Sequence, residues 1–110
     1  MYENKRKYLR NLVNCSDPNI LSDVVRKKMP REFRAELWTQ LLQSQSLREK
    51  NPGVYTSLLK FPSEQSSRIL RDVARTFPSE PLFAENGAGQ LALLNVLRAY
   101  SIFDSELGYW

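Results

Sequence analysis

The sequence predicts an all-helical protein, and three observations support that prediction. Apolar residues recur at helical spacing along several segments, and proline and glycine residues fall between these segments. The third observation is that no run of alternating β-branched residues indicates a strand. We therefore expect helices over residues 2–13, 20–27, 31–43, 53–60, 64–76 and 90–103.

Composition limits the chemistry that the chain can perform. Its 110 residues are 42% hydrophobic and 25% charged, which is ordinary for one small soluble domain or a piece of a larger one. The sequence holds no His and a single Cys, Cys15. A Ser-His-Asp triad, a Cys-His pair, the Cys/His zinc patterns and an internal disulfide are therefore excluded.

The positive charge lies in the N-terminal third of the chain. Residues 1–34 hold nine of the 16 Lys and Arg residues and four of the 12 acidic residues. Such a bias can attract nucleic acid or an anionic membrane, but no RNA-binding aromatic motif or DNA-reading helix accompanies it. We interpret residues 1–19 as a solvated basic segment before a domain over 20–110, and we expect no nucleic-acid partner.

The segment 31–43 begins beside Pro30, a residue favoured at the first helical position. On a helical wheel Arg34 falls in the middle of an apolar arc that includes Trp38. The other members of this arc are Phe33, Leu37, Leu41 and Leu42. Arg34 can stack on the Trp38 ring or pair with a buried acid, and both roles stabilise the fold; a ligand-binding role is the alternative.

The segment 64–76 separates into two faces. Ser63 is a predicted N-cap, and Pro78 disfavours helical geometry at Phe77. One arc is apolar, with Ile69, Leu70, Val73, Ala74 and Phe77, and the opposite arc holds Arg68, Arg71, Asp72 and Arg75. Asp72 can hold Arg68 or Arg75, which are its helical neighbours. Arg75 either complements the helix dipole in the last turn or has a function.

The segment 90–103 is apolar on almost every side. Ten of its 14 residues are apolar, a pattern typical of a central helix covered by several neighbours. The chain offers few surfaces to cover it. We therefore expect either a truncated domain or a partner on this helix, and self-association through 90–103 is one way to bury it.

Three blocks, in order, resemble the TBC domain family of Rab GTPase-activating proteins. KKMPREFRAELW (27–38) is similar to the opening of the domain, with its Pro and R-x-x-x-W pattern at Pro30, Arg34 and Trp38. ILRDVART (69–76) is similar to the I-x-x-D-x-x-R motif, which falls on Ile69, Asp72 and Arg75. GAGQLALLNVLRAYSIFDSELGY (87–109) resembles the stretch before the Y-x-Q motif, whose Tyr is Tyr109. Lys28 departs from the family, which usually has Gly there.

The resemblance implies an all-helical protein that accelerates GTP hydrolysis by a Rab-type GTPase. In this family the motif Arg, here Arg75, is the arginine finger supplied in trans; Asp72 positions it and Ile69 anchors the helix. The Gln of Y-x-Q orients the attacking water, and no Gln follows Trp110 in this sequence. We therefore expect the N-terminal part of a TBC domain, truncated, and weak or inactive alone. GTP and Mg²⁺ belong to the partner, and the chain needs no cofactor or metal of its own.

A second function from another class stays open. The chain can be a non-catalytic helical module, such as a truncated isoform that docks a GTPase or another helical protein through 90–103. If the chain is instead part of a Rab GTPase-activating protein, the parent protein is expected to regulate vesicle traffic. We then expect a cytoplasmic location, with peripheral attachment to endomembranes through the parent protein.

Overall fold

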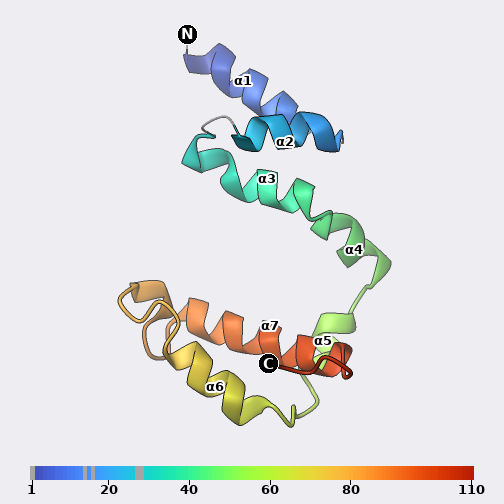
Figure 1. The fold of residues 1–110 in the computed structure, drawn as a ribbon, viewed down its shortest axis with the longest axis vertical. Helices are drawn as coiled ribbons and strands as arrows, with labels where there is room; N and C mark the ends of the chain where they lie inside the picture. The colour runs from blue at the N-terminus through green and yellow to red at the C-terminus, as the bar shows by residue number, and fades with distance from the viewer. Residues whose placement is uncertain (1, 14, 16, 27–28) are drawn as a thin grey trace. The chain divides into compact units, whose positions relative to one another are not determined.

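The computed structural model describes the whole chain except residues 1, 14, 16, 27 and 28 (Figure 1). It divides into two compact units, Met1–Asn51 and Pro52–Trp110. All the elements in the described residues are helical, and no strand occurs among them. The all-α prediction is therefore confirmed.

The first unit contains α1 (Tyr2–Val13), α2 (Pro18–Arg26), the 3₁₀ helix η1 (Arg31–Phe33), α3 (Arg34–Leu41) and α4 (Ser44–Lys50). Its core is a cluster of Leu21, Phe33 and Leu37, with Met29 packed against it. Because α1 packs against α2, η1 and α3, the predicted basic segment 1–19 lies within this unit. The predicted start of the domain at residue 20 stays a prediction.

The second helix begins earlier than expected. It was predicted over 20–27, but α2 begins at Pro18. The Asp17 side chain accepts a hydrogen bond from the Asn19 backbone N–H at 2.9 Å, and Pro18 has the fixed φ that suits a first helical residue. The Asp-Pro pair thus marks the start of the helix, two residues before the first apolar residue from which the prediction began. Residue 27, the expected end, lies outside the described residues.

The predicted helix 31–43 is interrupted. Residues 31–33 form a 3₁₀ turn, α3 ends at Leu41, and Gln43 takes a left-handed conformation with φ 51° before α4 begins. Only Phe33 and Leu37 of the predicted apolar arc are buried. The other three, Trp38, Leu41 and Leu42, are exposed, because this short helix is covered on one side only.

The helix α4 was missing from the prediction. Its sequence SQSLREK has no apolar stripe to indicate a helix, and in the structure it buries no residue. Local contacts support it instead. Gln45 Nε2 donates to Glu49 Oε1 at 2.9 Å, and Asn51 Nδ2 donates to the Leu47 carbonyl at 2.8 Å.

The second unit contains α5 (Val54–Leu58), α6 (Ser66–Ala74), the 3₁₀ helix η2 (Pro81–Phe83) and α7 (Ala88–Phe103). α7 is central to this unit, since α5, α6 and η2 all pack against it (Figure 1). Ile69 and Val73 of α6 and Ala99 of α7 form its buried apolar positions. The Ser63 and Ser101 hydroxyls, 2.6 Å apart, add a polar contact between the segment before α6 and the end of α7.

α7 confirms the expected long apolar helix and extends it by two residues at its start. Leu91, Val96, Tyr100 and Phe103 remain exposed on it within this unit. As the sequence indicated, the helix has more apolar surface than its neighbours cover. None of the described helices is both long and apolar enough to cross a membrane.

Candidate functional site

The helix α6 is oriented by the two side chains that it buries. Ile69 is fully buried and Val73 almost so, four residues apart on the face that packs on α7. Asp72, the residue before Val73, lies away from that face and is half-buried. Ile69, the residue expected to anchor this helix, is thus the most buried side chain of the unit.

α6 ends at Ala74, two residues before its predicted end, and Arg75 is its C-cap. Phe77 has a φ of 45°, a conformation that bulky residues rarely adopt. Its ring is exposed and contacts Phe83, with centroids 5.7 Å apart. Phe77, predicted on the apolar arc of this segment, therefore does not share the buried face of α6, and Leu70 of the same arc is also exposed. The chain has already left the helix at Arg75, so Phe77 cannot keep the helical register.

Ser63 does not cap α6, because the N-cap is Gln65. The Ser63 hydroxyl instead accepts a hydrogen bond from the Gln65 backbone N–H at 3.2 Å and contacts Ser101. Ser63 thus makes a turn that precedes the helix and ties this turn to α7. The predicted capping role was wrong because a serine favours such local turns as readily as a cap.

Asp72 pairs with Arg75 at the end of α6. Arg75 Nε lies 3.0 Å from Asp72 Oδ1, and Arg75 Nη2 lies 2.8 Å from the same oxygen. Of the two partners that helical spacing allowed, Arg68 and Arg75, the structure gives Asp72 an ion pair with Arg75. The Arg75 side chain is 79% exposed and that of Asp72 is 30% exposed. A held but exposed guanidinium can bind an anionic group on another molecule.

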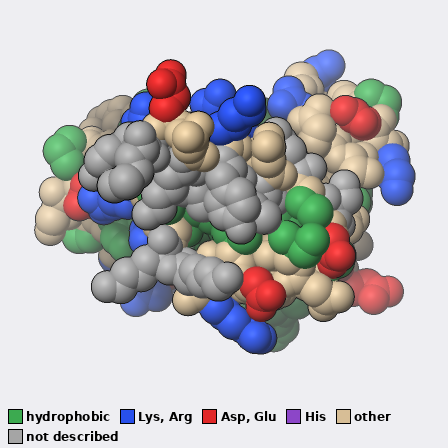
Figure 2. All heavy atoms as spheres, turned by 90° about the horizontal axis from the view of Figure 1, so that it is seen from above, with side chains coloured by type: hydrophobic (Ala, Val, Ile, Leu, Met, Phe, Trp, Pro, Cys, Tyr) green, Lys and Arg blue, Asp and Glu red, His purple; other side chains and the backbone are tan. Residues whose placement is uncertain are grey.

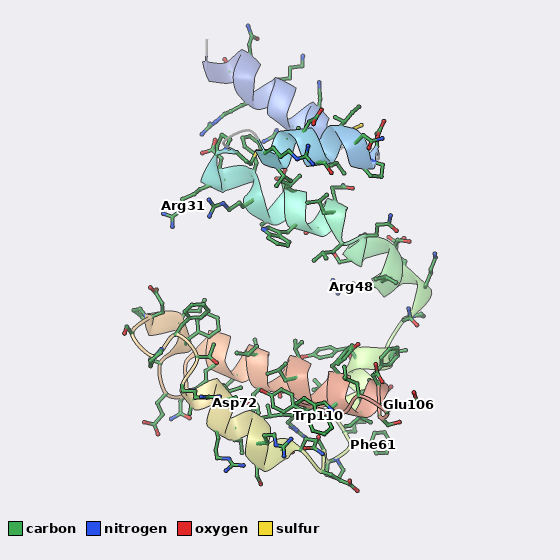
Figure 3. All side chains as sticks on the ribbon, in the orientation of Figure 1. Arg31, Arg48, Phe61, Asp72, Glu106 and Trp110 are labelled. Atoms are coloured by element: carbon green, nitrogen blue, oxygen red, sulfur yellow. The ribbon has the colours of Figure 1, made fainter. Side chains whose placement is uncertain are left out.

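Tyr109 joins this pair from the other end of the unit. Its hydroxyl donates to Asp72 Oδ2 at 2.7 Å. This bond and then the one from Arg75 hold the pKa of the Asp72 carboxyl below its usual range. The same bond raises the pKa of Tyr109, because an ionised phenol could not donate to the carboxylate. Figure 3 shows Asp72 on α6.

Two residues that bring Tyr109 to α6 were not among the predicted site residues. Gly108 has a φ of 62°, and its N–H donates to the Asp104 carbonyl at 2.7 Å. Arg68 Nη1 donates to the Tyr109 carbonyl at 3.3 Å. The signal for Gly108 was present, since a glycine shortly after a helix commonly takes a left-handed conformation that turns the chain. No sequence pattern indicated the Arg68 contact.

The predicted fold-defining residues Pro30, Arg34 and Trp38 lie in the first unit. Pro30 precedes η1, as its predicted place at a helix start requires. Arg34 and Trp38 line one open hollow of about 620 Å³ together with Met29, Leu37 and neighbouring side chains. Trp38 is 60% exposed, so it does not belong to a buried arc. Lys28, the departure from the family pattern, lies outside the described residues.

Charge is distributed in small groups. Figure 2 shows Lys and Arg side chains at several separate places on the face that it presents, with Asp and Glu side chains among them. In the first unit Arg6 pairs with Glu32 at 3.1 Å, so part of the N-terminal positive charge meets an acidic partner. The site residues Asp72 and Arg75 likewise balance each other.

The family model of the Rab-GTPase-TBC domain matches residues 31–110. The chain belongs to this family. The match contains all the site residues of the second unit, and Pro30 lies one residue before it. It confirms the resemblance to TBC domains.

Curated relatives agree with the family assignment. Human TBC1 domain family member 1 is 40% identical over 101 residues, which cover 84% of this chain and 9% of the relative. Mouse TBC1 domain family member 4 is 36% identical over 113 residues, covering 91% of this chain and 9% of the relative. The human ecotropic viral integration site 5 protein homolog is 41% identical over 90 residues, covering 81% of this chain and 11% of the relative. The chain thus spans about a tenth of the length of these relatives. No solved structure gives a significant match to it.

Proposed function

We propose that this chain contributes an arginine finger, Arg75, to GTP hydrolysis by a Rab-type small GTPase. The observation that carries the proposal is the placement of Arg75 within a matched TBC domain. Its guanidinium is paired with Asp72 at the end of α6, a helix whose other face is buried against α7. The Arg75 side chain is still 79% exposed. A partner can therefore reach it without unfolding the helix.

The chemistry suits an arginine in this position. Negative charge on the phosphate oxygens must be stabilised in the transition state of phosphoryl transfer, and a guanidinium stays protonated at every physiological pH. Such a finger increases the rate of GTP hydrolysis by about 10³–10⁵-fold in GTPases. Asp72 would orient the guanidinium, and Ile69 would fix the helix that carries both. The GTP and Mg²⁺ would be bound by the GTPase, so this chain would hold no cofactor.

The 110 residues alone would be a weak or inactive activator. The family resemblance assigns a second role to the Gln of Y-x-Q, and the 110 residues contain the Tyr of this motif, Tyr109, without that Gln. Strong activity would then require that Gln in addition to these residues. The same membership supports a role in vesicle traffic, in the cytoplasm, with attachment to endomembranes through other parts of the longer protein.

The test is single-turnover GTP hydrolysis by a panel of Rab proteins, with the 110-residue chain and with a form that continues beyond residue 110. We expect the longer form to stimulate at least one Rab and the short chain to stimulate none strongly. Failure of the longer form on every Rab would contradict the proposed function. Strong stimulation by the short chain, lost on Arg75→Ala, would contradict its inactivity alone but support the finger.

A second candidate function is a non-catalytic helical binding module. The observation that favours it is the exposed apolar surface of α7, with Val96, Tyr100 and Phe103 along one side. These side chains follow one another at spacings of four and three residues, which places them on one face of the helix. A GTPase or another helical protein that buried this face would make the chain a docking element without any finger chemistry.

A further inference from the structure

A chain of hydrogen bonds runs from the last residues of the second unit to the exposed guanidinium. The Tyr109 hydroxyl donates to Asp72 Oδ2 at 2.7 Å, and Asp72 Oδ1 accepts from Arg75 Nε at 3.0 Å and pairs with Nη2 at 2.8 Å. Each carboxylate oxygen of Asp72 therefore accepts from a different residue. Asp72 is the link, since it contacts both Tyr109 and Arg75.

Tyr109 is held in place at both of its ends. Its carbonyl accepts from Arg68 Nη1 at 3.3 Å, while its hydroxyl reaches Asp72 one turn further along α6. The left-handed turn at Gly108 returns the chain after α7. In Figure 1 the segment after α7 runs back along the unit to the end marked C. The two contacts join residues that lie 37 and 41 positions apart in the sequence.

Arg75 needs such support because the helix no longer holds it. It is the C-cap of α6, with φ −98° and ψ 5°, and its side chain projects into solvent. An aspartate side chain can take several rotamers on a helix, and only some direct an oxygen at the residue three positions later. A short O–H···O⁻ bond to one oxygen selects the rotamer that leaves the other oxygen for Arg75.

We propose that Tyr109 is a positioning residue for Arg75, acting through Asp72. This inference rests on the proposed function for its meaning in catalysis, whereas the coupling itself concerns only this chain. The tyrosine of the partial Y-x-Q motif thereby gains a task separate from that of any glutamine after it. In this role Tyr109 does not contact the phosphates.

The protonation states agree with this coupling at neutral pH. The contact from Tyr109 is the largest cause that lowers the pKa of Asp72, followed by the hydrogen bond and charge of Arg75 and the charge of Arg71. The pKa of Tyr109 is raised chiefly by Asp72, against the opposing charges of Arg75 and Arg68. The carboxylate is thus ionised and the phenol protonated across the neutral range, so the bond persists there.

The first test uses the 110-residue chain and needs no GTPase. The Tyr109→Phe variant keeps the ring and removes only the hydroxyl, and Tyr100→Phe is the matched control because its hydroxyl lies 3.5 Å from Asp104. Carboxyl ¹³C NMR titration follows Asp72, and the ¹⁵N–¹H signal of Arg75 Nε reports its hydrogen bond. We expect Tyr109→Phe to raise the titration midpoint of Asp72 and to shift the Arg75 Nε signal toward that of Arg71.

The control variant should leave both signals where they are in the wild type. Unchanged Asp72 and Arg75 signals in Tyr109→Phe, in a chain whose amide spectrum remains folded, would overturn the proposal. Loss of the folded amide spectrum in this conservative variant would overturn it as well, because Tyr109 would then act on the fold and not on Arg75 alone.

The second test measures hydrolysis with a longer form that stimulates a Rab. Tyr109→Phe should lower the maximal rate about three- to tenfold, the loss expected for one hydrogen bond, without changing the affinity for the Rab. A drop in affinity at unchanged maximal rate would contradict positioning. Absence of stimulation by the wild type would instead contradict the proposed function, and the NMR result would stand apart from it.

Discussion

At the residue scale, the site depends on one carboxylate. Asp72 receives Tyr109 on one oxygen and Arg75 on the other, and both contacts join groups that are at least partly exposed. Each exposed contact alone is weak in water, since salt and side-chain entropy oppose it. Together the two contacts restrict the rotamers of the Asp72 side chain. Their main effect is to orient the Arg75 guanidinium, and their contribution to the stability of the fold is small.

The first prediction concerns pH and stability. The folded pKa of Asp72 lies below its ordinary value of 3.8, so its contacts stabilise the fold above pH 3.8 and lose this effect as the pH falls through the folded pKa. Asp72→Asn should therefore unfold at a lower denaturant concentration than the wild type at pH 7. The difference should shrink well below pH 3.8, as measured by urea unfolding at several pH values. A difference that stays constant to the lowest pH would contradict an ionised Asp72 in these contacts.

At the element scale, two close approaches define the second unit. Ile69 and Val73 seat α6 on α7, and η2 lies against the first turn of α7. At Gly89 a Cβ atom would lie 2.7 Å from Leu82 Cγ and 2.8 Å from the Leu82 carbonyl oxygen. Such distances are too short for carbon in contact with oxygen or carbon, so glycine permits this packing.

The second prediction follows from this contact. Alanine is a better helix former than glycine by about 1 kcal/mol, which alone would make Gly89→Ala stabilising. The clash with Leu82 should outweigh that gain and lower the free energy of unfolding by about 1–3 kcal/mol, as overpacking does. Thermal or urea unfolding measures it. Ser67→Ala, on the exposed face of α6, is the control and should be neutral or slightly stabilising. Stabilisation by Gly89→Ala would contradict the close packing of η2 against α7.

The sequence predicted the elements that bury apolar stripes and missed those that do not. α7 and the buried pair Ile69 and Val73 follow from periodicity, whereas α4, which buries nothing, has no such signal. The pairing of Asp72 with an arginine three or four residues away was expected from spacing. The hydroxyl of Tyr109 on Asp72 was not, because it depends on how the chain returns after α7, and no local pattern encodes a contact across 37 residues.

At the scale of the whole molecule, the chain covers about a tenth of relatives that it otherwise resembles over most of its length. Its second unit leaves Phe103 61% exposed on α7, and Val96 and Tyr100 on the same face are about half exposed. An apolar face of this kind drives association in water, because burial stabilises by about 25 cal/mol per Å² of apolar surface.

The third prediction is that the 110-residue chain associates through α7. Its sedimentation coefficient should rise with concentration, and Val96→Glu should reverse that rise by placing a charge on the face. Val25→Glu, at a similarly exposed position on α2, should leave the association unchanged. A compact monomer at every concentration would contradict an uncovered α7 face.

The central claim is that Arg75 acts in trans on a GTPase, and single-turnover hydrolysis tests it most directly. In a longer form that stimulates a Rab, Arg75→Ala should lower the stimulated rate by about 10³-fold or more. Arg71→Ala, which removes an exposed arginine from the same helix, is the matched control and should retain most of the stimulation. Stimulation by Arg75→Ala equal to that of the wild type would contradict the claim.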